Sequence, residues 1–435
     1  MIWENILKAI FLNTTTLPNA SHIAFASFIG TAIEFYDFYI YAMASALVIG
    51  PVFFPAAEPA AQELNAFITF GIAFIARPFG AILFGHFGDR VGRKATLAIS
   101  LFVMGVSTLL IGCLPGYDVL GIWAPILLCF LRFGQGMGLG GEWGGAALLA
   151  TENAPLNRRG WFGMFPQLGP SVGFLLATLT YLAISLWLTD TEFRQWGWRL
   201  PFFASALLVV VGLYVRFNLS ETVAFVAVLA EHRALKMPVS FLLKTHIKPV
   251  LLGAVAMTVC YNLFYTATVF CLSYGTKTLH ILRSDFLLML CVAITSMAFV
   301  TPVSAALSDR VGRRPILILG CSLAALAGFS LNSLMVHGNG LSITLFLSMA
   351  LLLMGVIFAP MGAFLPEQFP AQVRYTGAGL AYNLGGIIGA STAPFVSQVL
   401  VEKGGLSWVG YYVSAMALMS LFAVFLMREH ETSDF

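Results

Sequence analysis

Long apolar stretches alternate with short polar interruptions along the whole chain, and this pattern predicts its elements. Each stretch provides the ~20 residues that a membrane-spanning helix needs. The predicted spans are 22–49, 62–86, 95–114, 120–149, 160–188, 199–217, 247–275, 284–307, 315–336, 341–365, 375–401 and 406–427. The stretches are continuously apolar, whereas strands of a membrane barrel alternate polar and apolar residues. The pattern therefore predicts an all-α membrane protein with twelve transmembrane helices.

The longest polar interruption, from about Asn218 to His246, divides the predicted spans into six and six. We therefore expect an N-terminal six-helix bundle over 1–217, a cytoplasmic linker over 218–246 and a C-terminal six-helix bundle over 247–435. The first 21 residues lack a basic segment followed by an uninterrupted apolar core. We expect no cleavable signal peptide, and the first span would then direct membrane insertion.

Two polar motifs occur once in each half. GHFGDRVGRK from Gly85 to Lys94 returns as AALSDRVGRR from Ala305 to Arg314, an offset of 220 residues. Residues after span four match residues after span ten at an offset of 215: Glu152, Pro155 and Arg159 correspond to Glu367, Pro370 and Arg374. These repeats indicate two pseudo-symmetric bundles, which could rock about a central site and expose it to each face of the membrane in turn.

Composition and charge limit the possible functions. The chain is 59% apolar and 10% charged, with a mean hydropathy of +0.87, whereas soluble domains are about 25% charged. Sixteen of the 23 Lys and Arg residues fall on one side of the predicted spans, five on the other and two inside them. Because Lys and Arg are retained in cytoplasmic loops, both termini are expected in the cytoplasm. This asymmetry accounts for the net charge of +3, so no nucleic-acid partner is expected.

The sequence offers no nucleotide-binding loop and no soluble stretch long enough for an ATPase domain, so uphill transport would depend on an ion gradient. The six cysteines lie in or beside predicted spans without metal-ligand spacing, and no metal site is expected. We expect a transporter rather than an enzyme, with no cofactor beyond a proton as coupling ion.

Five charged residues lie well inside predicted spans, away from the span ends: Glu34, Asp37, Arg77, Arg132 and Glu142. Each charge at the bilayer centre costs about 2.5–3.5 kcal/mol on insertion scales, so each is a functional candidate, with a helix-locking ion pair as the alternative. At 1.5 Å per residue, Glu34 and Arg77 both lie roughly 18 Å from the cytoplasmic boundary and are plausible partners. Asp37 lies roughly 22 Å deep, within reach of Arg132 if the helices tilt.

Glu34, Asp37 and Tyr41 follow one another at i, i+3 and i+7, so they share a helical stripe that we expect to line the central cavity. Proton coupling needs a carboxylate whose protonation changes as the cavity changes face, because burial favours the neutral form and a nearby Arg favours the charged form. We expect Asp37, and after it Glu34, to carry the proton.

Arg77 or Arg132 could hold an organic anion once its acidic partner is protonated, since the guanidinium fork matches a carboxylate. With two buried cations against three acids, a monocarboxylate, hydroxy acid or zwitterion fits better than a multiply charged anion. Other midspan polar residues could bind substrate or instead join helices: Tyr41, Gln135, Glu142, Gln167, Tyr261, Asn262, Tyr265, Tyr382 and Asn383. Seven glycines between Gly134 and Gly145 predict close helix packing around span four.

Gly85, Asp89, Arg90, Gly92, Arg93 and Lys94 resemble the loop signature of the major facilitator superfamily. Within it, FIGTAIEFYDFYIYA, RFGQGMGLGGEWGGAALLATENAP and LPEQFPAQVRYTG resemble the metabolite:proton symporter family, which includes shikimate, dicarboxylate and proline/betaine carriers. The resemblance implies the major facilitator fold and a monomeric symporter of the inner membrane that imports a small organic metabolite. Sugar porters, which also set a first-span acid against a fourth-span Arg, support the pairing of Asp37 with Arg132.

The resemblance also implies a cytoplasmic gating network that holds the outward-facing state closed inside, with Asp89, Arg90 and Arg93 as its clasp. The expected gating residues are Gly85, Asp89, Arg90, Gly92, Arg93, Glu152, Arg159, Asp309, Arg310, Arg313, Glu367 and Arg374. A proton-coupled drug or metabolite exporter is the alternative function. Gly169, Pro170 and Gly173 in span five match the antiporter signature in part, but Phe165 and Phe174 stand where that signature has Gly.

Overall fold

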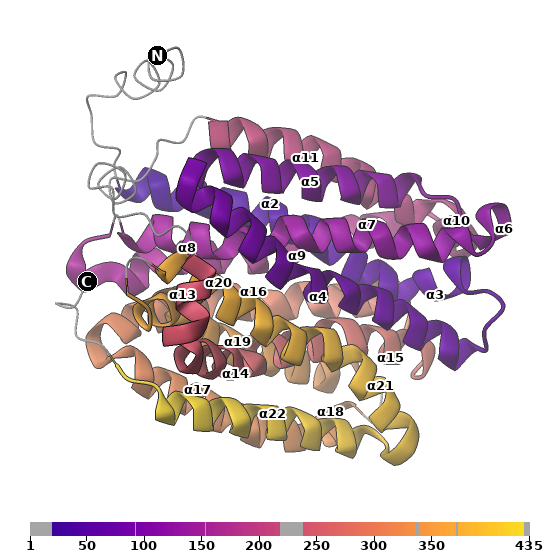
Figure 1. Cartoon of the computed structure of the whole chain (residues 1–435). Coiled ribbons are helices and arrows are strands. Elements are labelled where there is room, and N and C mark those ends of the chain that lie inside the picture. The colour runs from indigo at the N-terminus through magenta and orange to yellow at the C-terminus, as the bar shows by residue number, and fades with distance from the viewer. Residues whose placement is uncertain are drawn as a thin grey trace, which may run out of the picture.

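The computed structural model describes residues 20–91, 93–152, 154–217, 238–335, 339–370 and 373–429. All regular secondary structure in these ranges is helical. The long helices run side by side as one bundle, and helices of the first half of the chain lie above those of the second half in Figure 1.

The first half contains the long helices and the short connecting helices that precede residue 218. They are α2 (Ala20–Leu47), α3 (Ile49–Phe53), α4 (Pro59–Val91), α5 (Arg93–Cys113), α6 (Tyr117–Leu120), α7 (Trp123–Gly140), α8 (Glu142–Glu152), η1 (Leu156–Arg158), α9 (Arg159–Trp187), α10 (Asp190–Gln195), η2 (Gly197–Arg199) and α11 (Leu200–Phe217). Within this half α2 packs on α9 and α11, and α4 and α5 both pack on α7.

The second half repeats this arrangement. Its helices are α13 (Pro238–Thr245), α14 (Ile247–Tyr265), η3 (Thr266–Phe270), α15 (Cys271–Lys277), α16 (Arg283–Val311), α17 (Arg313–Ala327), η4 (Gly328–Ser330), α18 (Leu331–Met335), α19 (Gly340–Glu367), α20 (Arg374–Gly386), η5 (Ile387–Ser391), α21 (Thr392–Gly404) and α22 (Leu406–Leu426). Here α16 packs on α19, and α14 packs on α20 and α22. The η3 and η5 segments are single π turns inside continuous helices.

The predicted spans are confirmed to within a few residues. Eleven helical segments in the described ranges are long and apolar enough to cross a membrane. The twelfth traversal is made by α7 and α8, which are separated at Gly141. Of the expected linker, residues 218–237 lie outside the described ranges and 238–245 form α13.

The two ends of the bundle carry different polar residues. We call the end with Asp309, Arg313 and Glu367 the motif end, and the end with α3, α6 and α10 the far end (Figure 1). At the far end, Thr189 and Glu192 form a reciprocal capping box that begins α10. Hydrogen bonds from the backbone N–H and hydroxyl of Thr189 hold the pKa of Glu192 below its usual range.

The backbones of α4 and α7 approach each other closely at three glycines. A Cβ at Gly136 or Gly140 would overlap the carbonyl oxygen of Ala73 or Arg77, and one at Gly80 would overlap that of Met137. The predicted close packing around span four is thereby confirmed, and it sets the positions of Arg77 and Arg132 on the two helices.

Gly140→Ala should lower the stability of the detergent-solubilised protein by about 1–3 kcal/mol, because the new methyl group cannot fit against the α4 backbone. The measurement is the apparent melting temperature by intrinsic fluorescence. Gly379→Ala is the matched control, since a Cβ there meets nothing within 4 Å. Equal melting temperatures for the two variants would contradict the packing described for α4 and α7.

Candidate functional site

Arg77 on α4 is 1% exposed and lies among aromatic rings at the centre of the bundle. Its Cζ atom is 4.4 Å from the ring centroid of Phe38 and 4.1 Å from that of Phe74. Its Nε and Nη2 atoms have no hydrogen-bond partner. The rings stabilise the cation through their faces, but two donor atoms remain available to a ligand.

Arg132 on α7 is also fully buried, and each of its three nitrogens donates a hydrogen bond. Nη2 donates to the carbonyl of Phe70 at 3.0 Å, Nε to that of Thr69 at 3.3 Å, and Nη1 to the side chain of Gln135. Its Cζ atom lies 3.8 Å from the ring centroid of Tyr41. In this conformation each of the three nitrogens of Arg132 donates a hydrogen bond within the first half, and Arg132 joins α7 to α4.

The expected ion pair between Asp37 and Arg132 is not formed. Gln135 lies between them, donating at 3.0 Å to the backbone carbonyl of Asp37 and at 2.9 Å to Thr108. The Asp37 side chain is 0% exposed, and neither carboxyl oxygen has a hydrogen-bond partner in the described part of the chain.

The second expected pair, Glu34 with Arg77, is also not formed between these two described residues. Glu34 is 2% exposed. Glu142, expected near substrate, accepts a hydrogen bond at 2.9 Å from Ser100 and so faces α5. The position of a residue along its helix does not determine the direction in which its side chain points.

The stripe through Asp37 and Tyr41 faces the interior of the first half rather than the seam between halves. The Tyr41 hydroxyl is 2.7 Å from Thr69 on α4. The neighbouring residue Tyr39 faces the second half and stacks on Phe264, with centroids 5.0 Å apart. The expectation that this stripe lines the central cavity is therefore wrong for this conformation.

Second-half aromatics close the centre opposite Arg77. The rings of Tyr261 and Tyr265 lie nearly parallel at 6.4 Å, and Tyr265 is 5.4 Å from Phe74. The amide atoms of Asn262 are buried and lack hydrogen-bond partners. Tyr261 and Tyr265 thus lie beside Phe74, the ring that the guanidinium covers, and their hydroxyls can accept or donate hydrogen bonds.

Three side chains bridge the halves at the same depth. Tyr382 stacks on Trp143 with centroids 4.0 Å apart and planes 4° apart. Trp143 donates to Gln167 at 2.9 Å, and Gln167 donates to the carbonyl of Phe358 at 2.8 Å. Asn383 donates to the carbonyl of Gly140 at 2.9 Å. These contacts leave the centre filled with side chains, so this conformation is closed around the site.

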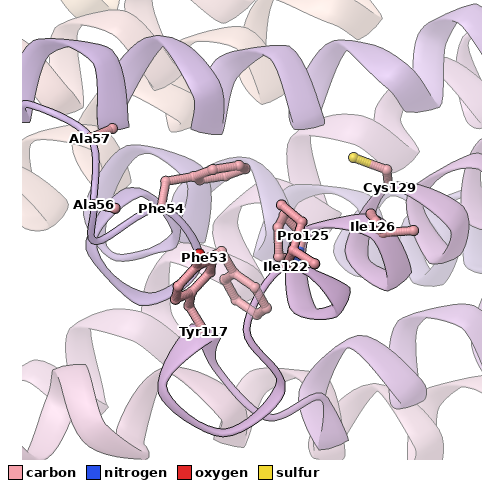
Figure 2. A pocket seen from close by; sticks show the side chains of 9 residues that line it. All are labelled: Phe53, Phe54, Ala56, Ala57, Tyr117, Ile122, Pro125, Ile126 and Cys129. Atoms are coloured by element: carbon pink, nitrogen blue, oxygen red, sulfur yellow. The ribbon is translucent and has the colours of Figure 1, made fainter.

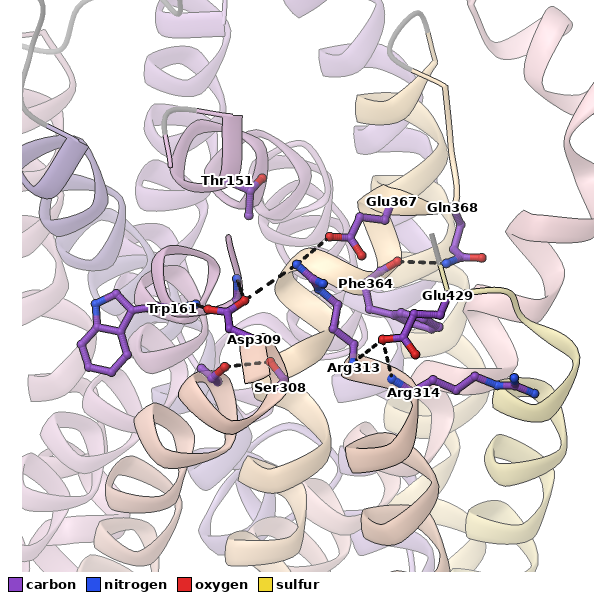
Figure 3. Close-up of polar contacts among 12 residues, drawn as sticks. Thr151, Trp161, Ser308, Asp309, Arg313, Arg314, Phe364, Glu367, Gln368 and Glu429 are labelled. Atoms are coloured by element: carbon purple, nitrogen blue, oxygen red, sulfur yellow. Dashed lines mark hydrogen bonds and ion pairs between the residues drawn. The ribbon is translucent and has the colours of Figure 1, made fainter. Parts of the chain in front are cut away.

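The motif end is closed by a network that includes both halves (Figure 3). Asp309 on α16 accepts hydrogen bonds at 2.8 Å from the backbone N–H groups of Gly160 and Trp161, at the start of α9. A carboxylate at a helix N-terminus satisfies free N–H groups and interacts favourably with the helix dipole. The repeated Asp of the second half therefore caps a helix of the first half.

Within the second half, Arg313 pairs with Glu367 at 2.9 Å and lies 3.9 Å from Asp309. Gly312 has a φ of 100°, a left-handed conformation that favours glycine. Glu429 accepts a hydrogen bond from the backbone N–H of Arg313 (Figure 3). The motif thus turns the chain between α16 and α17 while placing its charges in the network.

The other expected gating residues occupy the same end where they are described. Arg374 donates at 3.1 Å to the carbonyl of Phe369, and Gly85 lies beside the ring of Tyr375. Arg159 is buried at the start of α9, Glu152 ends α8, and Arg310 is exposed beside a cavity of about 390 Å³. Gly92 and the side chains of Asp89, Arg90 and Arg93 lie outside what the structure describes.

Two ion pairs at the far end were not foreseen from the sequence. Lys277 on α15 pairs with Glu63 on α4 at 3.4 Å, and Arg283 on α16 pairs with Asp190 on α10 at 3.0 Å. Ser273 also donates to Glu63. Each pair joins the two halves, so inter-half contacts close both ends of the bundle.

An apolar pocket of about 440 Å³ lies beside α3, α6 and α7 (Figure 2). Its lining is Phe53, Phe54, Ala56, Ala57, Tyr117, Ile122, Pro125, Ile126 and Cys129. None of these side chains is charged and none was expected to bind substrate. The pocket therefore lacks groups that recognise a charged metabolite.

Twelve traversals in two similar halves, with buried charges at the seam and inter-half contacts at both ends, define a membrane transporter of the alternating-access type. The profile of the Sugar (and other) transporter family matches residues 23–237 and again residues 227–435. The chain belongs to this family, within the major facilitator superfamily, as its motifs predict. It is a multi-pass membrane transporter and not an enzyme.

Similar proteins include the inner membrane metabolite transport protein YhjE of Escherichia coli, 48% identical over 95% of this chain and 96% of the relative. The shikimate transporter of Escherichia coli is 36% identical over 96% of this chain and 97% of its own length. The Escherichia coli proline/betaine transporter is 34% identical over 93% of this chain and 82% of its own.

Solved structures with the same fold include the Escherichia coli xylose transporter XylE in a partially occluded inward-open conformation. Its TM-score is 0.74 at 18% identity, covering 94% of this chain and 98% of that one. A D-xylose-proton symporter has a TM-score of 0.73 at 19% identity, covering 95% of this chain and 99% of that one. The major facilitator fold is thereby confirmed.

Glu367→Gln should destabilise the protein by about 3 kcal/mol, because it leaves the buried Arg313 with only the more distant Asp309. Combining it with Arg313→Gln should recover most of the loss, since no uncompensated charge then remains. Melting temperatures of the single and double variants test this, with the exposed Glu402→Gln as control. A double variant no more stable than Glu367→Gln would show that the pair itself is not the source of the effect.

Proposed function

We propose that this transporter imports a small organic acid or zwitterion by proton symport, with Asp37 carrying the proton and Arg77 holding the substrate carboxylate. One observation carries the proposal: the Asp37 carboxyl inside the first half and the Arg77 guanidinium at the centre are both buried, and neither is neutralised by an ion pair in the described structure. Buried charges in membrane helices are otherwise paired.

Asp37 has the properties of a proton carrier. An ionised carboxylate that is buried without hydrogen bonds or a cation is costly. The neutral, protonated carboxyl avoids this cost, so the closed conformation is compatible with a bound proton. Gln135 links Asp37 to Arg132 through the backbone, so a small rotation of α2 or α7 would change the distance between the two side chains. Opening toward either face would then alter proton affinity.

Arg77 has the properties of a substrate anchor. Its free Nε and Nη2 atoms provide two donors of the guanidinium fork, which suits a planar carboxylate. Tyr261 supplies an uncharged hydroxyl for a polar group of the same molecule, and this hydroxyl has no hydrogen-bond partner among the described residues. A substrate with one carboxylate and a polar or cationic body would satisfy these groups together.

The named relatives support this substrate class. Shikimate, proline and betaine differ in shape and net charge, but each carries one carboxylate. The solved symporter with the same fold is named for proton coupling. For one proton, a membrane potential of 100 mV supplies about 2.3 kcal/mol and a gradient of one pH unit about 1.4 kcal/mol. Together they allow roughly 10²- to 10³-fold accumulation of a neutral zwitterion. For a monoanion the electrical part cancels.

The orientation in the membrane follows from charge. Lys and Arg concentrate beside the motif end, so that end would face the cytoplasm, with both termini, and the far end would face outward. YhjE is named as an inner membrane protein, and the same membrane is proposed here. A single chain contains both halves of the site, which supports action as a monomer with no cofactor besides the proton.

Asp37→Asn should abolish accumulation driven by an inward proton gradient while preserving counterflow, because the amide is permanently neutral. Uptake of radiolabelled shikimate, proline and betaine into proteoliposomes would identify a substrate and measure both activities. Asp285→Asn, an exposed carboxylate at the far end, is the control. Gradient-driven accumulation by Asp37→Asn at the native level would reject Asp37 as the proton carrier.

Arg77→Lys should weaken substrate binding by about 10- to 100-fold, because the ammonium keeps the charge but loses the bidentate fork. Arg77→Gln should weaken it further. Binding is measured by substrate-dependent shifts in melting temperature across a concentration series. Both variants binding with native affinity would exclude Arg77 as the carboxylate site, whatever the role of Asp37.

A further inference from the structure

A cavity of about 630 Å³ opens at the far end, at the seam between the two halves. Its polar lining comes from α9 and α10 on one side and from α15, the following loop and α16 on the other. The residues used below are Ser185, Asp190, Arg194, Lys277, His280 and Arg283. We call this cavity the outer vestibule. It lies directly beside the ion pairs that close the far end.

The outer vestibule is basic although the far end as a whole is acidic. Toward that end lie seven acidic residues, Glu58, Glu63, Asp118, Asp190, Glu192, Asp285 and Glu402, and five basic ones, Arg194, Arg199, Lys277, Arg283 and Lys403. Three of the five basic residues line the vestibule, against one acid, Asp190. Charge is therefore segregated, with the cations gathered where the seam opens.

Arg283 is built into the vestibule wall, whereas its acidic partner is not. The guanidinium donates at 2.8 Å to Ser185 and lies 3.7 Å from the ring centroid of Phe193, and its side chain is 14% exposed. Asp190 is 82% exposed. Ion pairs with so exposed a partner contribute little net stability, so another carboxylate could replace Asp190 on Arg283 without disturbing the guanidinium.

Arg194 supplies charge without a competing partner. It is exposed on α10, and no ion pair or hydrogen bond to its side chain occurs in the described ranges. Lys277 lies twelve residues beyond Tyr265 on the same span, or roughly 18 Å at 1.5 Å per residue. The vestibule and the central aromatic site thus lie along the same span, and the closed conformation separates them.

We propose that the outer vestibule is an anion-collecting entry site, in which Arg194, Lys277 and Arg283 attract a small organic anion whose carboxylate displaces Asp190 from Arg283. Displacement removes one of the two ion pairs that hold the far end shut, so capture favours opening. This inference rests on the proposed function and specifies its entry route. The first test measures the labelling rate of a cysteine in the vestibule and does not depend on transport. A negative result there can therefore be distinguished from a negative result for the proposed roles of Asp37 and Arg77 in transport.

The electrostatic potential inside the outer vestibule can be measured with a cysteine placed in its lining. Ser284→Cys places a thiol in its lining, and Ser407→Cys places one at the far end outside it, in a background where the more accessible Cys113 and Cys129 are replaced by Ala. Negatively and positively charged methanethiosulfonate reagents are compared at each site. The rate ratio is the labelling rate of the negative reagent divided by that of the positive reagent. From the Coulomb energy of unit charges about 10 Å apart in water, this ratio should be on the order of tenfold higher at Ser284→Cys than at Ser407→Cys.

Charge variants make the assignment specific. Arg194→Gln should lower the rate ratio at Ser284→Cys about fourfold, Asp190→Asn should raise it by a similar factor, and Lys403→Gln should leave it unchanged. Salt at 1 M should remove the preference, because the Debye length is then about 3 Å. Equal ratios at the two cysteines, or a ratio insensitive to Arg194→Gln, would overturn the proposal.

The replacement of Asp190 on Arg283 by another carboxylate is tested by labelling with a neutral methanethiosulfonate reagent. Benzoate and shikimate, compared with chloride at equal ionic strength, should slow labelling of Ser284→Cys at least twofold and leave Ser407→Cys unaffected. Arg283→Gln should abolish this protection, while Arg199→Gln, a basic residue outside the vestibule, should not. Labelling that neither carboxylate slows, or protection that persists in Arg283→Gln, would refute the exchange step.

Discussion

Backbone contact between α4 and α7 is the constraint on which the other features of this structure depend. It is possible only because Gly136 and Gly140 present no side chain to α4. At Gly140, where α7 ends, the backbone carbonyl accepts a hydrogen bond from Asn383 of the second half. One run of glycines therefore brings two helices close enough to hold Arg77 and Arg132 side by side and provides a polar surface for the opposing bundle.

The two buried arginines show how a membrane protein separates a structural charge from a functional one. Arg132 directs its donors to two backbone carbonyls and to Gln135, which fixes α7 on α4. Arg77 is stabilised by the faces of Phe38 and Phe74, and ring faces do not occupy N–H groups as a carboxylate would. An aromatic environment thus lowers the cost of burying the cation while leaving it able to bind an anion.

The sequence predicted the fold well because apolar length and repeated motifs are properties of the chain itself. It placed Arg77 and Asp37 within spans for the same reason, but it did not predict their partners. Helical periodicity relates residues on one helix and does not determine how that helix is rotated against its neighbours. Gln135, one turn from Arg132, intercepts the expected contact with Asp37. The pair of Lys277 and Glu63 was missed because its members are far apart in sequence and belong to neither repeated motif.

The closing contacts differ in burial between the two ends of the bundle. At the motif end, Arg313 and Glu367 are almost completely buried, with side-chain exposures of 6% and 3%, and Asp309 caps α9 through two backbone N–H groups. At the far end, Lys277 is 39% exposed and Asp190 is 82% exposed. Separating a buried pair costs about 3–5 kcal/mol, whereas an exposed pair contributes about 0–1 kcal/mol. The proposed displacement of Asp190 from Arg283 would therefore cost less free energy than the separation of Arg313 from Glu367 at the motif end.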